Sequence, residues 1–390
     1  METLEFSGLE DGDCIVAVVQ QPQLAATDCA FALWCEGLGL VTWGHPDFGG
    51  DSAAVQDQLK NIRQIRSTRY AFAAILADGS VVTWGTPDFG GDSTVVQDKL
   101  QKVQQIHSTE RSFAAILADR TVVTWGEPAY GGHSFDVRDQ LKNVKQIHST
   151  RYAFAAILAD GSVVTWGDPD TGGDSSAVQD QLRDVQQIHG ADFAFSAVLK
   201  NRNVVTWGMS GFGGDSTGVQ DKLANVQQIH STERSFAAIL ADGTVVTWGH
   251  QKYGGDSSAV RDQLKNVKQI HSTECAFAAI LADGTVVTWG EPDYGGDSSS
   301  VRDQLKNVQE IHTTQCAFAA ILADRTVVTW GFEIFGGDSS AVQDQLRNVQ
   351  QIHATQLAFA AVLADGRVVT WGFESYGGDS TAVQDQFNHL

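Results

Sequence analysis

The stretch Ala71-Phe-Ala-Ala-Ile-Leu-Ala-Asp-Gly-Ser-Val-Val-Thr-Trp-Gly85 decides the fold, because it recurs with little change along most of the chain. A tryptophan marks each copy, and consecutive copies are 41 residues apart. The nine tryptophans are Trp43, Trp84, Trp125, Trp166, Trp207, Trp248, Trp289, Trp330 and Trp371. A fixed period of this length predicts a repeat architecture, so that fold and function depend on one unit and on how its copies stack.

Each unit is predicted to form three antiparallel strands, which in the second copy span residues 63–67, 71–77 and 80–84. Asp78-Gly79 is a strong signal for a two-residue hairpin between the second and third strands. Side chains alternate between the two faces of a strand. Phe72 and Ala74 therefore lie opposite Ala73 and Ile75. Because both faces are apolar or small, each sheet needs a neighbour on both sides.

The segment that links one unit to the next, residues 49–59 in the first copy, is expected to contain a short helix, and a bent outer strand is the alternative. Asp51 or Ser52 can cap its N-terminus, and Val55 and Leu59 have i, i+4 spacing. In a later copy, the pattern from Ser175 to Gln179 resembles a capping box.

Radial stacking of such sheets produces a propeller, in which each blade covers the next. We therefore predict an all-β fold with short linker helices: a closed β-propeller of nine three-stranded blades. The repeats occupy residues 22–390, a length of 369 residues or nine times 41, and residues 1–21 form an N-terminal extension with possible extra strands. A flat solenoid would also bury both faces of each sheet, but its two ends would need caps.

The repeat resembles that of the regulator of chromosome condensation family, whose unit also ends an Asp-Gly hairpin in Trp-Gly. Residues 143–167 show the pattern best, and the resemblance covers residues 22–390. It implies a β-propeller. The period here is shorter than the usual family repeat, and is more similar to the propeller-type β-lactamase inhibitor of the same superfamily. Related repeats occur in HECT-type ubiquitin ligases, but neither a HECT domain nor the inserted segments of the nucleotide-exchange factor have a counterpart in this chain.

Composition restricts the function. A net charge of −21 argues against nucleic acid as a partner. We find no apolar run long enough to span a bilayer and no signal-peptide pattern at the start, so we expect no membrane partner and a cytoplasmic or nuclear location. The five cysteines follow no disulfide pattern and are expected to be reduced. The chain is expected to be a monomer.

The repeats differ most from one another in two short stretches, which are the turn between the first two strands and the residues after Trp-Gly. Antiparallel geometry places both stretches on the same rim. Variable loops on a rigid scaffold are typical recognition sites, and aromatic and arginine side chains are frequent at interface hot spots. The same variation would also arise by drift at exposed positions. The candidate partner-binding residues are Arg69, Tyr70, Glu110, Arg111, Arg151, Tyr152, Asp192, Phe193, Glu233 and Arg234.

A second candidate site is a column of equivalent positions in the first strand of each repeat. If this strand is innermost, the side chains ring a central channel and form an anion site, a metal site or a pH sensor. The alternative is a packing residue that is hydrogen-bonded to the next blade. The residues are Arg66, His107, His148, His189, His230, His271, His312 and His353.

The sequence contains no nucleophile elbow, zinc motif, phosphate loop or dinucleotide fingerprint. We therefore expect no catalytic residues, no cofactor and no metal. The predicted function is a non-enzymatic scaffold that binds a protein partner on the rim. The alternatives are a ligand-binding or catalytic channel lined by the histidines, and a regulatory module associated with ubiquitin ligation.

Overall fold

The computed structural model describes residues 23–35 and 39–381. Within them the chain forms nine separate three-stranded antiparallel sheets, each made of three consecutive strands. We number these sheets 1 to 9 in chain order. The strand pair predicted within residues 1–21 lies outside the described residues.

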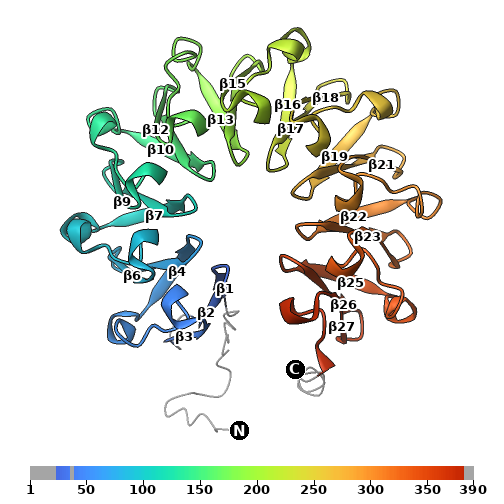
Figure 1. Cartoon of the computed structure of the whole chain (residues 1–390), viewed down its shortest axis with the longest axis horizontal. Coiled ribbons are helices and arrows are strands. Elements are labelled where there is room, and N and C mark those ends of the chain that lie inside the picture. The colour runs from blue at the N-terminus through green and yellow to red at the C-terminus, as the bar shows by residue number, and fades with distance from the viewer. Residues whose placement is uncertain (1–22, 36–38, 382–390) are drawn as a thin grey trace, which may run out of the picture.

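Each sheet has an inner, a middle and an outer strand, named by their positions in Figure 1. The inner strands are β1 (Gln23–Ala26), β4 (Ile62–Ser67), β7 (Val103–Ser108), β10 (Val144–Ser149), β13 (Val185–Gly190), β16 (Val226–Ser231), β19 (Val267–Ser272), β22 (Val308–Thr313) and β25 (Val349–Ala354). The middle strands are β2 (Ala30–Cys35), β5 (Ala71–Leu76), β8 (Ser112–Leu117), β11 (Ala153–Leu158), β14 (Ala194–Leu199), β17 (Ser235–Leu240), β20 (Ala276–Leu281), β23 (Ala317–Leu322) and β26 (Ala358–Leu363). The outer strands are β3 (Gly39–Gly44), β6 (Val81–Gly85), β9 (Val122–Gly126), β12 (Val163–Gly167), β15 (Val204–Gly208), β18 (Val245–Gly249), β21 (Val286–Gly290), β24 (Val327–Gly331) and β27 (Val368–Gly372).

The segments between sheets contain short helices, as predicted, and these are of the 3₁₀ type. One set follows the outer strands directly: η1 (Pro46–Phe48), η3 (Pro87–Phe89), η5 (Pro128–Tyr130), η7 (Pro169–Thr171), η8 (Ser210–Phe212), η10 (Gln251–Tyr253), η12 (Pro292–Tyr294), η13 (Glu333–Phe335) and η15 (Glu374–Tyr376). The second set is η2 (Gln56–Gln58), η4 (Thr94–Lys99), η6 (Phe135–Val137), η9 (Thr217–Lys222), η11 (Ser258–Val260) and η14 (Gln343–Gln345).

Side-chain hydrogen bonds explain why no longer helix forms. Asp51 accepts a bond from the Ala53 N–H at 2.8 Å and closes a tight turn. The predicted capping box at Ser175 is wrong, because the Ser175 hydroxyl bonds the Gln179 side chain at 2.8 Å. The amide of Gln179 in turn donates to the Val163 carbonyl at 2.9 Å and fastens the linker to the outer strand β12.

Both faces of the sheets are covered, as their sequence predicts. Phe72 and Trp84 of sheet 2 pack with Ala32 and Trp34 of sheet 1 in one cluster. On the opposite face, Ile75 joins a cluster with residues of sheet 3. The core is thus a series of layers, one between each pair of neighbouring sheets.

A phenylalanine and a tryptophan close each of these layers. The Phe72 and Trp84 rings stack with centroids 5.1 Å apart. The indole N–H of Trp84 donates to the carbonyl of Gly49, in the linker that follows sheet 1, at 3.1 Å. The same bond recurs at the other seven junctions between sheets, at 3.0 to 3.2 Å. Only glycine fits at the position whose carbonyl accepts this bond. The φ angle of Gly49 is +100°, and a Cβ added to Gly49 would lie 2.6 Å from the Phe72 ring.

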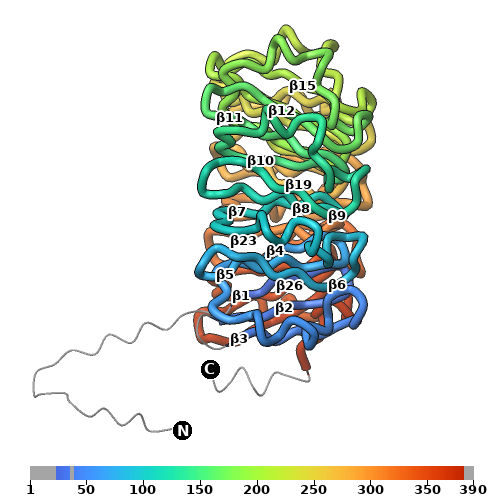
Figure 2. The backbone as a smooth tube through the Cα atoms, turned by 90° about the vertical axis from the view of Figure 1, so that its left-hand side faces the viewer, coloured from blue at the N-terminus to red at the C-terminus, as the bar shows by residue number. Residues whose placement is uncertain are grey.

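The nine sheets follow one another around an open arc with the inner strands on its concave side (Figure 1). Seen from the side, the two limbs of the arc overlap, so that the arc lies close to one plane (Figure 2). Sheets 1 and 9 stand at its two ends without meeting. The fold is therefore all-β and propeller-like, and the predicted closure of the ring is not seen.

Candidate functional site

The turns between inner and middle strands join into a continuous rim. In sheet 2, the Thr68 hydroxyl accepts a bond from the Ala71 N–H at 3.1 Å and donates to the Phe89 carbonyl at 2.8 Å. This bond ties the turn to η3, so that the two variable stretches lie together as predicted. The Arg69 N–H donates to the carbonyl of Glu110 in sheet 3 at 2.9 Å. The equivalent bonds continue from Asp28 in sheet 1 to Gln356 in sheet 9, which makes the rim a single hydrogen-bonded ladder.

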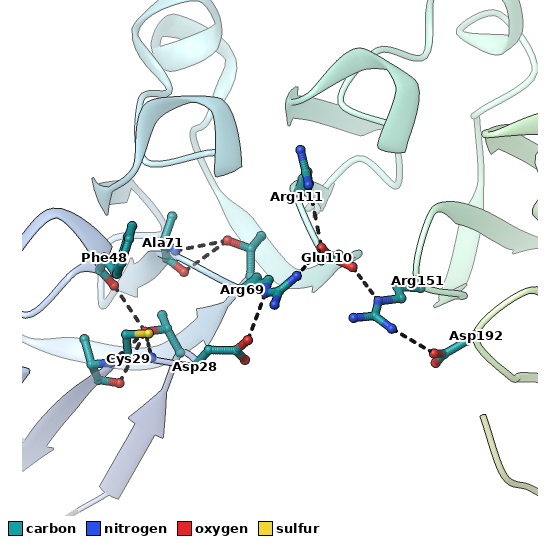
Figure 3. Close-up of polar contacts among 12 residues, drawn as sticks. Asp28, Cys29, Phe48, Arg69, Ala71, Glu110, Arg111, Arg151 and Asp192 are labelled. Atoms are coloured by element: carbon teal, nitrogen blue, oxygen red, sulfur yellow. Dashed lines mark hydrogen bonds and ion pairs between the residues drawn. The ribbon is translucent and has the colours of Figure 1, made fainter. Parts of the chain in front are cut away.

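Charged side chains at the ladder positions form what we call the charge line. Its members are Asp28, Arg69, Glu110, Arg151, Asp192, Glu233 and Glu274. Over the first five sheets the charges alternate in sign and pair from sheet to sheet (Figure 3). Arg69 bridges Asp28 at 2.9 Å and Glu110 at 3.1 Å. Arg151 bridges Glu110 and, at 3.3 Å, Asp192.

Ion pairing and burial have opposite effects on the acids of this line. Burial disfavours the charged form of Glu110, but hydrogen bonds from Arg151 and Arg69 outweigh it and lower the pKa of that carboxyl. At Asp192 the alternation ends, because two further acids, Glu233 and Glu274, follow it in succession. Burial and the charge of Glu233 raise the pKa of Asp192 to about 6. Burial, Glu233 and Asp192 raise the pKa of Glu274 to about 7.

A second row of side chains, which we call the aromatic line, runs beside the charge line. It consists of Phe48, Tyr70, Phe89, Arg111, Tyr130, Tyr152, Phe193, Phe212, Arg234 and Tyr253. Tyr70 lies between Phe48 and Phe89, with centroids 4.4 and 4.7 Å away. The Arg111 guanidinium lies 4.7 Å from the ring centroids of both Phe89 and Tyr130. Arg234 lies 4.7 Å from the centroid of Tyr253, which repeats this cation–π arrangement.

The structure brings all ten predicted rim residues into these two lines, five into each. Sequence reasoning left out Asp28 and Glu274 of the charge line. The stretch after Trp-Gly was predicted to belong to the rim, but its aromatic residues, such as Phe89 and Tyr130, were not among the named candidates. Their signal was present, because the fourth residue after Trp-Gly is aromatic in every copy except the one that carries Thr171.

The histidine column lies on the inner strands, as predicted; its side chains from His107 to His312 are partly buried, whereas Arg66 and His353 are exposed. Burial lowers the pKa of His107, His148 and His230 to about 4, and a neighbouring histidine contributes in each case. The hydrogen bond expected to the next blade is not what is observed for His107 and His230. Each contacts a glutamine two residues earlier on its own strand, at 3.3 Å. Arg66 and His353 occupy the equivalent positions of β4 and β25.

Two further findings concern the part of the chain that the structure describes. No three histidine, cysteine, aspartate or glutamate side chains are grouped there as metal ligands. No helix there has the length and apolar character needed to cross a membrane. Cys29, Cys275 and Cys316 form no disulfide among the described residues, and Cys14 lies outside them.

Comparison with known proteins gives structural matches only. No family model and no curated protein matches the chain. Among solved structures, the computationally designed protein Ika8 is 15% identical over 80% of this chain and 96% of its own, with a TM-score of 0.35. Prp20p from Saccharomyces cerevisiae, which is yeast RCC1, is 19% identical over 61% of this chain and 74% of its own, with a TM-score of 0.37. Human WBSCR16 is 15% identical over 62% of this chain and 79% of its own, with a TM-score of 0.41.

Yeast RCC1, a member of the family that the repeat resembles in sequence, is thus among the solved structures that match this chain. Three-stranded antiparallel sheets follow one another, each with the hairpin that ends in Trp-Gly. Nine such sheets lie in the described residues.

Proposed function

We propose that the chain is a non-enzymatic scaffold that binds a protein partner through the charge line and the aromatic line. The main support is the continuity of this surface: residues from seven successive sheets share one hydrogen-bonded rim. Its tyrosines, phenylalanines and arginines are the side chains that most often dominate protein interfaces. Stacking and ion pairing already hold these side chains in place, which reduces the entropy lost when a partner binds. A monomeric state and a cytoplasmic or nuclear location belong to the same proposal.

Charge reversal of the rim arginines tests this proposal. The triple variant R69E/R111E/R151E should lose the partners that the wild type retains in affinity purification. Because Arg69 and Arg151 pair with Glu110, the folded state of the variant must be verified by circular dichroism and thermal unfolding. A milder variant, R111Q/R234Q, removes the two stacked cations and leaves those pairs intact.

The matched control is R183E/R347E, which reverses two exposed arginines in the linkers, away from the rim. Partner loss in both rim variants, with retention in the control, supports the proposal. If the wild type, the rim variants and the control all retain the same proteins, rim binding is refuted. Loss in a variant of the inner-strand histidines alone would favour the channel alternative.

The closed nine-bladed ring is also part of this proposal, because the two ends of the arc carry matching halves of the junction between sheets. Phe31 and Trp43 of sheet 1 stack at 5.2 Å like the pairs in other sheets, yet they are 38% and 44% exposed. At the other end, a Cβ on Gly377 would meet nothing within 4 Å, although the eight equivalent glycines each face a phenylalanine at 2.5 to 2.6 Å. Closure would insert Phe31 beside Gly377 and let the Trp43 N–H donate to its carbonyl.

A further inference from the structure

One face of sheet 1, at the end of the arc, is an apolar sheet surface without a neighbouring sheet (Figure 1). Phe31 and Leu33 of β2 lie on this face, because they alternate with Ala32 and Trp34, which pack against sheet 2. The strand register places three cross-strand partners on the same side. We call this surface the end face; its side chains and their exposed fractions are Leu24 56%, Phe31 38%, Leu33 36%, Val41 62% and Trp43 44%.

The equivalent face of sheet 2 is covered both by sheet 1 and by the linker between the two sheets. Its five side chains are at most 7% exposed, and they share one cluster with Leu59 of that linker. A linker leucine joins the layer at all eight described junctions and is at most 2% exposed: Leu59, Leu100, Leu141, Leu182, Leu223, Leu264, Leu305 and Leu346. A complete junction therefore consists of two sheets and one apolar linker residue.

The sequence supplies a ninth linker after sheet 9. Residues 382–390 lie outside the described residues, and residues 382–386 repeat the sequence of residues 341–345 without change. Phe387 stands at the position of the eight leucines, and Leu390 stands at the position of Val349, which is fully buried. Within the described part of the chain, sheets 2 to 9 each have a linker leucine against this face, and sheet 1 has none.

A side-chain hydrogen bond indicates how this linker would be held at the opening of the arc. The Gln343 amide donates to the Val327 carbonyl of β24 at 2.9 Å, and this bond fastens the preceding linker to the outer strand of its own sheet. Gln384 stands at the same position of the last copy. Sheets 1 and 9 flank the same opening (Figure 1). A segment fastened to sheet 9 therefore has a high effective concentration for the end face of sheet 1.

The larger side chain of Phe387 is matched by a smaller one in sheet 9. Ile321 of sheet 8 packs in the same cluster as Leu346. Its equivalent in sheet 9 is Val362, which is smaller, while the linker residue changes from leucine to phenylalanine. Paired changes that keep the total volume are the ones that a packed layer tolerates best.

We propose that residues 382–390 complete the closing junction of the ring, with Phe387 packed on the end face of sheet 1. This inference rests on the closed ring proposed above and names the segment that seals it. The competing occupant of the end face is a second copy of the chain, which would join end to end.

Hydrogen–deuterium exchange of the full-length chain, measured by mass spectrometry, tests the proposal. In F387D the amides of β2 and β3 should exchange at least tenfold faster than in the wild type, because a carboxylate cannot cover the apolar end face. Amides of β14 and β15, in the middle of the arc, should exchange at an unchanged rate. F387L, which installs the residue of the other junctions, should preserve the exchange rates of the wild type.

D385N is the matched control in the same segment, because the side chain of the equivalent Asp344 is fully exposed. It should exchange like the wild type. Unchanged exchange of β2 and β3 in F387D, or equal acceleration of β14 and β15, would overturn the proposal. Protection of β2 and β3 that increases with protein concentration would also overturn it, because a second copy would then cover the end face.

Electron microscopy of the wild type distinguishes this proposal from ring closure itself. A closed ring together with unchanged exchange in F387D would refute the role of residues 382–390 and leave closure intact. An open arc would refute both.

Discussion

At the residue scale, Glu274 shows how the position of a carboxyl along the rim determines its pKa. Its carboxyl follows Asp192 and Glu233, without an arginine of the charge line between them. Burial and these two acids raise its pKa to about 7. The folded state therefore holds a proton that the unfolded chain releases near its ordinary value of 4.5. Stability from this group is present at low pH and is lost as the pH rises from about 4.5 through 7.

We predict that E274Q is more stable than the wild type at pH 8 and that the difference shrinks toward pH 5. Glutamine is tolerated here, because Gln315 and Gln356 occupy the equivalent positions of sheets 8 and 9. Melting temperatures at both pH values measure the effect. The reverse change, Q315E, should lower the melting temperature at pH 8. Equal melting temperatures for E274Q and wild type at pH 8 would contradict the assignment.

Gly254 shows how tightly neighbouring sheets approach. Its φ is +94°, and an added Cβ would lie 2.5 Å from the Phe277 ring. We predict that G254A lowers the free energy of unfolding by about 2 to 4 kcal/mol, from steric overlap and left-handed strain together. G366A is the control, because its φ is +86° and no atom lies within 4 Å. Urea unfolding of both variants measures the difference; equal losses would show that the contact with Phe277 contributes nothing.

The residues that repeat are the ones whose position could be predicted. Alternation in Ala71–Leu76 fixes which side chains face which neighbour, and Asp78-Gly79 fixes the hairpin. The Arg111 guanidinium lies between the rings of Phe89 and Tyr130, and such contacts join residues from different sheets. They depend on the distance between neighbouring sheets, which the repeat period of the sequence does not give. The pairing of Arg69 with Glu110 likewise depends on which sheets are adjacent.

At the element scale, the packing of the inner strands makes the stability of the fold depend on pH. Their histidines are partly buried, and burial lowers the pKa of His107, His148 and His230 to about 4. Between about pH 6.5 and 4 the unfolded chain therefore binds protons that the folded chain does not. Stability from the neutral histidines is complete above pH 6.5 and is lost as the pH falls toward 4.

We predict that the wild type melts at a lower temperature at pH 5 than at pH 7.5. The triple variant H107Q/H148Q/H230Q should lose less over the same interval, because glutamine does not titrate. Differential scanning calorimetry at the two pH values provides the comparison. An unchanged melting temperature of the wild type would rule out a pH-sensing role for the column.

The linkers contain the predicted short helices, but the spacing of the sequence misleads about their type. Spacing of Val55 and Leu59 predicted an α-helix, but the structure has the short 3₁₀ turn η2. Gln56 donates to the Leu40 carbonyl at 3.0 Å, and this bond holds the linker along the outer strand. A side chain that bonds a strand edge competes with helix propagation, and nothing in the local sequence shows where that edge lies.

At the scale of the whole molecule, the account depends on covering both faces of every sheet. Eight junctions meet this need with the same stacked pair and the same indole hydrogen bond. The two ends of the arc carry the two unpaired halves of a ninth such junction: Phe31 and Trp43 at one end, and Gly377 at the other. Exposed apolar surface of this kind favours association, and two ends on one chain have a high effective concentration for each other.

The most direct test is an electron microscopy average of the purified chain viewed along the ring axis. We predict nine sheets in one closed ring, with sheet 1 against sheet 9, and a monomeric mass in solution. An open arc or an extended row in the averages would contradict the claim that the two ends seal each other, as would joining of separate copies through their ends.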